Sequence, residues 1–314
     1  MLKFLIFRGL YALPVLLGVA LIVFIALHLA PGDVTQQILG LGASEERAQA
    51  LRIQLGLDRP VLVQFFIWLG NLLQGDLGMS HYMNVPVVDV LSRKIGNSLI
   101  LTGGSLFIVV LISFVLGTMS AARFRRPFDR FTVVLSLLLA SMPVFWLGLI
   151  FLYAFGIIWP IFPTAGMYDL KNPGGVLDVL HHLVLPATAT AAAGVAIMTR
   201  VTRASLIEVL GQPYIMAARA RGLKERAVVY GHGVRNILPQ FVNMTGLNVG
   251  FLFGSSVFAE VIFTWPGIGL QLYDSILKRD GAMVQGCVLA IAFVFVLSNL
   301  IADFVVYVLD AKKK

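Results

Sequence analysis

Long stretches free of Asp, Glu, Lys and Arg divide this 314-residue chain and limit the folds open to it. An apolar window of 18 or more residues without charge is long enough to cross a bilayer core of about 30 Å. The third window runs on to Tyr168, but Pro160 and Pro163 break its second half, so we assign one span there. The predicted transmembrane helices are Gly9–Leu29, Gly96–Ala122, Phe131–Ile158, Leu183–Thr199, Ile237–Ala259 and Gly281–Ala302.

The composition agrees with a chain whose folded surface mostly faces lipid. Only 13% of the residues are charged, compared with about 25% in a typical soluble domain. The single cysteine, Cys287, excludes an intrachain disulfide or a zinc cluster built on cysteines, and its apolar surroundings indicate a packing residue. The predicted fold class is therefore all-α: a polytopic bundle of six transmembrane helices in a single domain, 1–314.

The distribution of positive charge predicts the orientation in the membrane. Sixteen of the 24 Lys and Arg residues lie at the two termini and after spans two and four. Eleven of the 16 acidic residues lie on the opposite side. By the positive-inside rule both termini are cytoplasmic. The net charge of +8 is then explained by topology, and no nucleic-acid partner is expected.

Two segments outside the spans are too long to be simple turns. The first, 33–95, is predicted to be an extracytoplasmic insertion after the first helix. Within it, Ser44–Gly56 predicts a short amphipathic helix with Glu45 and Glu46 in its first turn. Val61–Leu73 is apolar but too short to span, so it should pack on the bundle or lie at the membrane interface. The second segment, 200–240, is predicted to be a cytoplasmic loop.

The cytoplasmic loop carries the most informative motif. Ala218 and Gly222 lie four residues apart, which predicts that they share one helix face where another chain can approach closely. Gly222 is also a natural helix end. Basic residues beside it can bind an acidic partner. The predicted coupling residues are Ala217, Ala218, Arg219, Arg221, Gly222 and Lys224.

The Ala-Ala-x-x-x-Gly pattern followed by Leu238-Pro239 resembles the EAA loop of permease subunits of ATP-binding-cassette (ABC) importers. The pattern from His232 to Pro239 is similar to the form found in dipeptide, oligopeptide, nickel and glutathione importers. Met216 stands where the general motif has glutamate. The other matching segments, spread along nearly the whole chain, are Leu55–Pro60 with Gln64, Gly75–Gly78, Ser141–Pro143 with Phe145-Trp146, Glu260 to Gly269, and Asn299 with Asp303.

The resemblance implies a permease that moves peptides across a bacterial or archaeal cytoplasmic membrane by alternating access. It also implies a second homologous permease subunit, two ATP-binding subunits that dock on the loop, and an external solute-binding protein. The same machinery serves nickel, glutathione or an oligosaccharide, so the substrate stays open. The sequence contains no Gly-x-x-x-x-Gly-Lys-[Ser/Thr] phosphate loop. We therefore expect ATP and Mg to bind the partner subunits, with no cofactor, metal or catalytic residue in this chain.

The resemblance implies an external gate in the segment after span five. Pro266, Gly267 and Gly269 break regular structure, and irregular backbone near a membrane persists only where it is buried or lines a cavity. In the resembling family this loop, led by Glu260, forms part of the gate. Trp265 fits the gate or an aromatic anchor at the interface.

Polar residues within the spans leave their roles open. Asn243 and Asn248 fit a pore lining or contacts with neighbouring helices. Asp303 shares a helix face with Asn299 and Tyr307, which fits a gate contact or a hydrogen-bonded stripe inside the bundle. The pair His181-His182 lacks companions for a metal site and is assigned to an interfacial loop. A secondary transporter would predict inverted repeats or several mid-membrane ionisable residues, and neither is evident.

Overall fold

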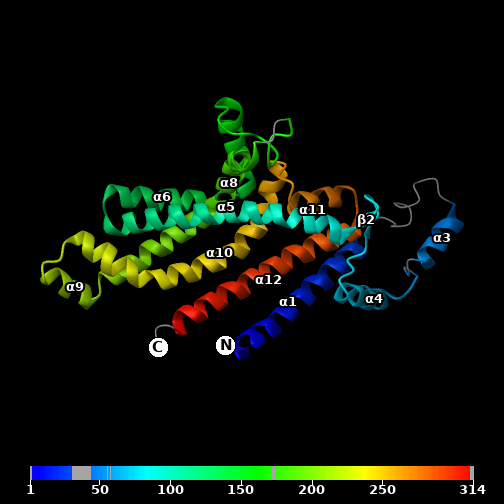
Figure 1. Cartoon of the computed structure of the whole chain (residues 1–314), viewed down its shortest axis with the longest axis horizontal. Helices are drawn as coiled ribbons and strands as arrows, with labels where there is room; N and C mark the ends of the chain where they lie inside the picture. The colour runs from blue at the N-terminus through cyan, green and yellow to red at the C-terminus, as the bar shows by residue number, and fades with distance from the viewer. Residues whose placement is uncertain (1, 30–43, 55, 57, 172–173, 312–314) are drawn as a thin grey trace. The chain divides into compact units, whose positions relative to one another are not determined.

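The computed structural model describes residues 2–29, 44–54, 56, 58–171 and 174–311. Almost every described element is a helix, as the sequence predicted. The elements are α1 (Leu2–Leu29), α3 (Glu45–Gln54), α4 (Val61–Leu73), β1 (Met79–Ser80), β2 (Val85–Pro86), α5 (Val87–Ala122), α6 (Pro127–Ser141), α7 (Val144–Phe151), the π-helical η1 (Leu152–Ile158), α8 (Gly175–Leu210), α9 (Pro213–Ala220), the π-helical η2 (Ala227–Gly233), α10 (Val234–Ile262), α11 (Ile268–Leu277) and α12 (Gly281–Ala311) (Figure 1).

The chain forms two compact units, which we describe separately. The first unit comprises residues 1–96 and 271–293. In it the amphipathic helix α4 packs on the C-terminal end of α1 through aromatic rings. The Phe24 ring lies 5.3 Å from Phe65 and 5.7 Å from Trp68, centroid to centroid. His28, at the end of α1, is 3.0 Å from the Gln64 side-chain oxygen. These contacts hold α4 against α1. The sequence analysis allowed packing on the bundle or a position at the membrane interface, and the structure shows the packing.

A small hairpin is attached to the start of α12 in the same unit. Strands β1 and β2 pair antiparallel, with Ser80 opposite Val85. The buried Ser80 hydroxyl donates a hydrogen bond to the Asp280 carboxylate. The other Asp280 oxygen accepts the Met283 amide at 3.3 Å and so caps the first turn of α12.

The second unit comprises residues 97–270 and 294–314 and is built around α8. The middle of α8 is rich in alanine, and its small side chains allow α5, α6, α7 and α10 to pack closely on it. Gly117 of α5 shows the closeness of this packing, because a Cβ there would lie 2.7 Å from Thr202 of α8. Figure 1 shows α9 beyond the end of α8, and α6 folded back beside α5. Val229 of η2 packs with Leu206 beside the last turns of α8.

The apolar helices agree with the predicted spans, with one structural difference. Within the described residues, five helices are long and apolar enough to cross a membrane, and the number is six if a bent pair counts as one span. The bent pair joins α6 to the α7–η1 segment with an angle of 106°. We expected one continuous helix over Phe131–Ile158. The chain instead breaks at Met142-Pro143, because proline has no amide hydrogen to donate and its ring disfavours helical backbone at the preceding residue.

Other predicted elements are found where expected. The helix predicted over Ser44–Gly56 is α3, and α4 has the predicted bounds. Part of the predicted insertion lies outside the described residues, namely 33–43, Leu55 and Leu57. The last two belong to the matching segment Leu55–Pro60. Helices α8 and α10 are longer than the predicted spans, since their charged ends continue the helix. The predicted cytoplasmic loop, 200–240, is therefore shorter in the structure. The connection from α8 to η2 covers only 211–226 and contains the short helix α9.

Candidate functional site

The loop between α8 and η2 contains the short helix α9, which is anchored on its own chain. Pro213 occupies the first turn of α9, where its fixed backbone angle favours a helix start. The inner face of α9 carries Ile215 and Ala218, which are 0% and 8% exposed and pack with Val228 of η2. Helix α9 is thus held as a small, separately packed element at the end of α8.

The structure contradicts the predicted shared face of Ala218 and Gly222. Helix α9 ends at Ala220, and Gly222 follows it with a positive φ of +81°, a conformation that favours glycine. The prediction that Gly222 ends the helix is correct. Ala218 faces the chain's own core, so its small side chain does not offer close approach to another chain.

Arg219 is engaged within the loop. Its guanidinium donates through Nε and Nη2 to the Glu225 carboxylate at 3.1 and 2.8 Å. Its Nη1 donates to the carbonyl oxygen of Leu210, the last residue of α8, at 3.3 Å. The hydrogen bond from Arg219 lowers the pKa of the Glu225 carboxyl below its ordinary value. Arg219 therefore connects three parts of the loop, whereas we expected it to bind an acidic partner.

The outer surface of the loop is apolar with basic side chains. Tyr214, Met216 and Leu223 are 48%, 55% and 42% exposed. Arg221 and Lys224, two of the predicted coupling residues, are also exposed, as is the predicted Ala217. Large apolar side chains exposed on a segment predicted to lie in water indicate an interaction surface. We call Tyr214, Met216, Ala217, Arg221, Leu223 and Lys224 the coupling surface.

The predicted gate segment folds as a tight turn held by Glu260. We expected Glu260 in the loop after the fifth span, but α10 continues to Ile262 and contains it. The Glu260 side chain is 1% exposed, and its Oε2 accepts the amides of Gly269 and Leu270 at 2.6 and 3.3 Å. The carboxylate satisfies backbone donors at the start of α11, where negative charge is favourable.

Trp265 is buried in the same turn, which excludes the interface-anchor role for it. Its side chain is 0% exposed, and its indole Nε1 donates to the carbonyl oxygen of Asn97 in α5 at 2.8 Å. The Asn97 side chain in turn donates to the carbonyl oxygen of Pro266 at 3.0 Å. Ser98 Oγ accepts the amide of Ile268 at 2.9 Å. The sequence analysis did not predict that Asn97 and Ser98 contact this turn. The only sign of such a role was that two polar residues stand together at the start of an apolar window.

The glycines of the turn are required by close packing. A Cβ on Gly267 would collide with the Glu260 carboxylate. A Cβ on Gly269 would lie 2.6 Å from the Cα of Val257 in α10. At both positions the added Cβ would come closer to its neighbour than van der Waals contact allows, so only glycine fits there.

The polar residues predicted within the spans occupy different surroundings. Asn243 is exposed on α10, whereas Asn248 is 9% exposed and its amide donates to the Met244 carbonyl oxygen. The Asn248 side chain lies beside Gly194 of α8. Asp303 and Asn299 are half-buried on α12, and the Tyr307 side chain lies outside the described residues.

A buried ion pair was not anticipated from the sequence. Asp129, in the first turn of α6, is 2% exposed, and Arg203 of α8 donates to both of its oxygens at 2.5 and 2.8 Å. The Ser120 hydroxyl and the Arg125 amide also donate to this carboxylate. The ion pair joins α6, α8 and the turn after α5. The only sign of this ion pair in the sequence was the acidic Asp129 shortly after a cluster of arginines.

His181 and His182 lie in α8, not in the interfacial loop that we expected. His182 Nδ1 is 3.0 Å from the Asp178 carboxylate one turn earlier. Among the residues that the structure describes, no group of three or more His, Cys, Asp or Glu side chains could hold a metal ion.

Comparisons with known proteins agree along the whole chain. Residues 113–314 match the family described as the binding-protein-dependent transport system inner membrane component. Residues 1–102 match the N-terminal family of the membrane components of such systems. The chain is 35% identical over 313 residues to the oligopeptide transport system permease protein AppB of Bacillus subtilis (strain 168), covering 99% of each chain. It is 36% identical over 303 residues to the glutathione transport system permease protein GsiC of Escherichia coli (strain K12), covering 96% of each chain.

Proposed function

The chain belongs to the family of inner membrane components of binding-protein-dependent transport systems, and from this premise we propose that it imports peptides. It is a multi-pass permease subunit of an ABC importer. The identity to AppB over nearly all of both chains supports an oligopeptide substrate. The similar identity to GsiC keeps glutathione, itself a small peptide, as the second candidate.

In this proposal the coupling surface docks on an ATP-binding subunit. The observation that carries it is the exposure of Tyr214, Met216 and Leu223 on a small helix whose other face is packed on its own chain. Specific protein interfaces combine such exposed apolar side chains with polar and basic ones, and Arg221 and Lys224 supply the basic side chains here. Arg219 and Glu225 support this surface by fixing α9 to the end of α8.

Movement of α9 would pass directly into the bundle. Helix α9 packs on η2, which continues into α10, and it is tied to the end of α8 through Arg219. ATP-driven closure of the partner subunits would therefore displace α8 and α10 together. The turn containing Glu260, Trp265 and Gly269 is the other end of α10, so displacement of α10 reaches the proposed external gate.

The remaining partners follow from the family. One chain with six spans supplies half of a translocation pathway, and a second homologous permease subunit supplies the other half. Two ATP-binding subunits bind ATP and Mg, and an external solute-binding protein delivers the peptide. Both termini and the coupling surface then lie in the cytoplasm, as the positive-inside rule predicts.

The first experiment is purification of the tagged chain from its native membrane in mild detergent, with its partners identified by mass spectrometry. We expect a second permease and an ATP-binding subunit to be recovered with it. Reconstitution with the external binding protein should then give ATP-dependent uptake of short peptides. Recovery of the chain alone, with transport that needs no ATP, would contradict the proposal.

A matched pair of variants tests the coupling surface within the same preparation. Met216→Asp places a charge on the exposed apolar surface and should reduce recovery of the ATP-binding subunit about tenfold or more, because desolvating an unpaired charge in an interface is costly. Met79→Asp changes a similarly exposed methionine of β1 (48% compared with 55% for Met216) and should leave recovery unchanged. Equal recovery in both variants would exclude this surface as the docking site.

A further inference from the structure

Beside the proposed gate turn, the second unit contains a hollow of about 880 Å³. The loop 163–171, the first turns of α8 and the turn at Thr264 and Pro266 form its walls. The amide of Gly166 donates to the carbonyl oxygen of Phe263 at 2.8 Å and fixes the loop to the gate turn. The volume lies within the range of small-ligand sites in proteins. No residue of the coupling surface or the buried ion pair lines this hollow.

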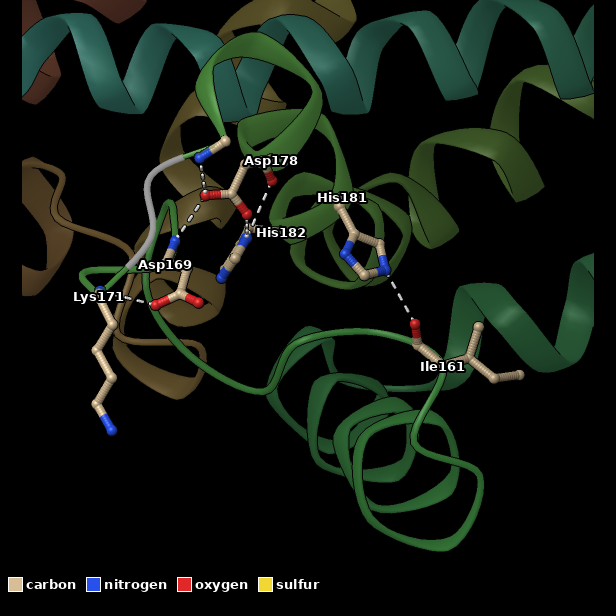
Figure 2. A network of polar contacts seen from close by, with 7 residues as sticks. Ile161, Asp169, Lys171, Asp178, His181 and His182 are labelled. Atoms are coloured by element: carbon tan, nitrogen blue, oxygen red, sulfur yellow. Dashed lines mark hydrogen bonds and ion pairs between the residues drawn. The ribbon is translucent and has the colours of Figure 1, made fainter.

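The Asp178 carboxylate organises the polar wall of the hollow (Figure 2). Its Oδ2 accepts the amides of Asp169 and Gly174 at 2.7 and 3.2 Å, which ties the loop to the first turn of α8. Its Oδ1 lies 3.0 Å from His182 Nδ1. The Asp178 carboxylate is therefore saturated, and its effect is to position Asp169 and His182 on the same wall.

The hydrogen bonds of His182 determine which of its ring nitrogens accepts. Nδ1 lies 3.0 Å from both the backbone oxygen and the carboxylate of Asp178, so Nδ1 carries the hydrogen. In the neutral ring Nε2 is then an acceptor. His182 is 8% exposed, and within the part of the chain that the structure describes Nε2 has no hydrogen-bond partner. The ring lines the hollow and is thus a preorganised acceptor.

Asp169 supplies a second acceptor beside it. Its Oδ1 accepts the amide of Lys171 at 2.8 Å, and its side chain lines the hollow with Oδ2 as the second acceptor. The other charged and titratable side chains of the lining are Tyr168, Lys171 and His181. Figure 2 shows the Lys171 side chain directed away from Asp178 and His182, and His181 Nε2 bonded to the carbonyl oxygen of Ile161 at 2.9 Å.

We propose that Asp169 and His182 form a subsite for the α-ammonium group of the incoming peptide. A primary ammonium has three donors and no acceptor, which matches one carboxylate and one imidazole acceptor. Its hydrogen bond to a carboxylate is charge-assisted and strong. A metal ion fits less well, because the described residues contain no group of three or more ligating side chains. The inference rests on the proposed import of peptides and applies equally to glutathione, which also carries an α-ammonium group.

The test measures binding of trialanine to the assembled transporter in nanodiscs, without the external binding protein, by saturation-transfer difference NMR. We expect saturation of the trialanine methyl groups at millimolar concentration and a signal about tenfold lower for N-acetyl-trialanine. Trialanine with an amidated C-terminus should keep the full signal. Equal signals for the free and acetylated peptides, or no signal for either, would overturn the subsite.

Variants separate this subsite from a general loss of structure. Asp169→Asn and His182→Gln should each reduce the trialanine signal to the level of the acetylated peptide while the variants still assemble with the ATP-binding subunit. Glu45→Gln, which removes an exposed carboxylate of α3, should bind trialanine like the unmodified chain. An Asp169→Asn variant with unchanged trialanine binding would overturn the proposal. Absence of ATP-dependent peptide uptake in the complete system would instead contradict the proposed function.

Discussion

At the scale of single residues, the gate turn depends on two glycines that the sequence indicated only as helix breakers. Their requirement is steric, because the Glu260 carboxylate and the backbone of α10 occupy the space that a Cβ would take. Glu260 needs this closeness to reach the amides of Gly269 and Leu270. The carboxylate and the glycines thus form one arrangement, and a change in either should loosen the turn.

Gly269→Ala tests this arrangement. The added methyl group would lie 2.6 Å from Val257 Cα, and overpacking of this kind costs about 1–3 kcal/mol. We expect a lower free energy of unfolding and a lower midpoint of thermal unfolding for the purified chain in detergent. Gly254→Ala is the control, because Gly254 lies on α10 near Val257 but has no atom within 4 Å of the added Cβ, and this variant should not lower the midpoint. Equal midpoints for both variants would show that the turn adjusts freely.

The ion pair between Asp129 and Arg203 is a second residue-scale feature with a measurable contribution. Asp129→Asn leaves a mostly buried guanidinium without its charged partner, which should cost about 3 kcal/mol of unfolding free energy. The double variant with Arg203→Gln should be more stable than the sum of the two single variants predicts. Additive losses, measured by denaturant unfolding in detergent, would mean that the pair does not act as a unit.

At the scale of elements, the exposed ion pair between Arg219 and Glu225 adds to the apolar packing that holds α9, so its attachment should depend on pH in a defined direction. The pKa of Glu225 is lowered in the folded loop relative to its ordinary value of 4.5. A carboxyl with a lowered folded pKa contributes its stabilisation fully above the unfolded value and loses it as the pH falls through the folded one. The attachment should therefore be constant from pH 8 to about 5 and weaken below pH 4.5.

A spin label at position 216 measures this attachment. With Cys287→Ala and Met216→Cys, we expect the label to be equally immobilised at pH 7.5 and 5.5 and more mobile at pH 4. Glu225→Gln should make it mobile at every pH, since the uncharged side chain lacks the ion pair. Glu208→Gln, which removes an exposed carboxylate of α8, should behave like the unmodified loop. An unchanged label in the Glu225 variant would contradict the role of the ion pair.

Local patterns predicted the elements well and the contacts between them poorly. Val61–Leu73 and the helix over Glu45–Gln54 follow from hydrophobicity and acidic N-terminal residues, which are local signals. The inward direction of Ala218 depends on Val228, and the burial of Trp265 depends on Asn97, more than 160 residues earlier in the chain. A single sequence does not show such pairings. The sequence showed Pro143 as a possible break, but it did not show that α6 and α7 both pack on α8.

At the scale of the whole molecule, the bent α6–η1 pair decides the topology. If the pair crosses the membrane, the chain has six spans, and the loop 159–174 lies on the side opposite the coupling surface. If the pair re-enters on the side it left, there are five spans and every later segment changes side. The charge distribution favours six spans, because the basic residues of 200–235 then lie in the cytoplasm with those of 123–130.

Labelling of single cysteines in intact cells distinguishes the two arrangements. In a Cys287→Ala background, Tyr168→Cys should react with a membrane-impermeant maleimide added outside, because the loop 159–174 is external in the six-span topology. Arg221→Cys should react only after the membrane is permeabilised, and Glu45→Cys in α3 is the external control. Residues 168 and 221 are both exposed in this chain. The cells used lack the ATP-binding subunits, so docking does not cover position 221 and a lack of reaction reports the side of the membrane. The five-span topology exchanges the two results, with Arg221→Cys labelled from outside and Tyr168→Cys protected. That outcome would place the coupling surface outside the cell and exclude its docking on an ATP-binding subunit.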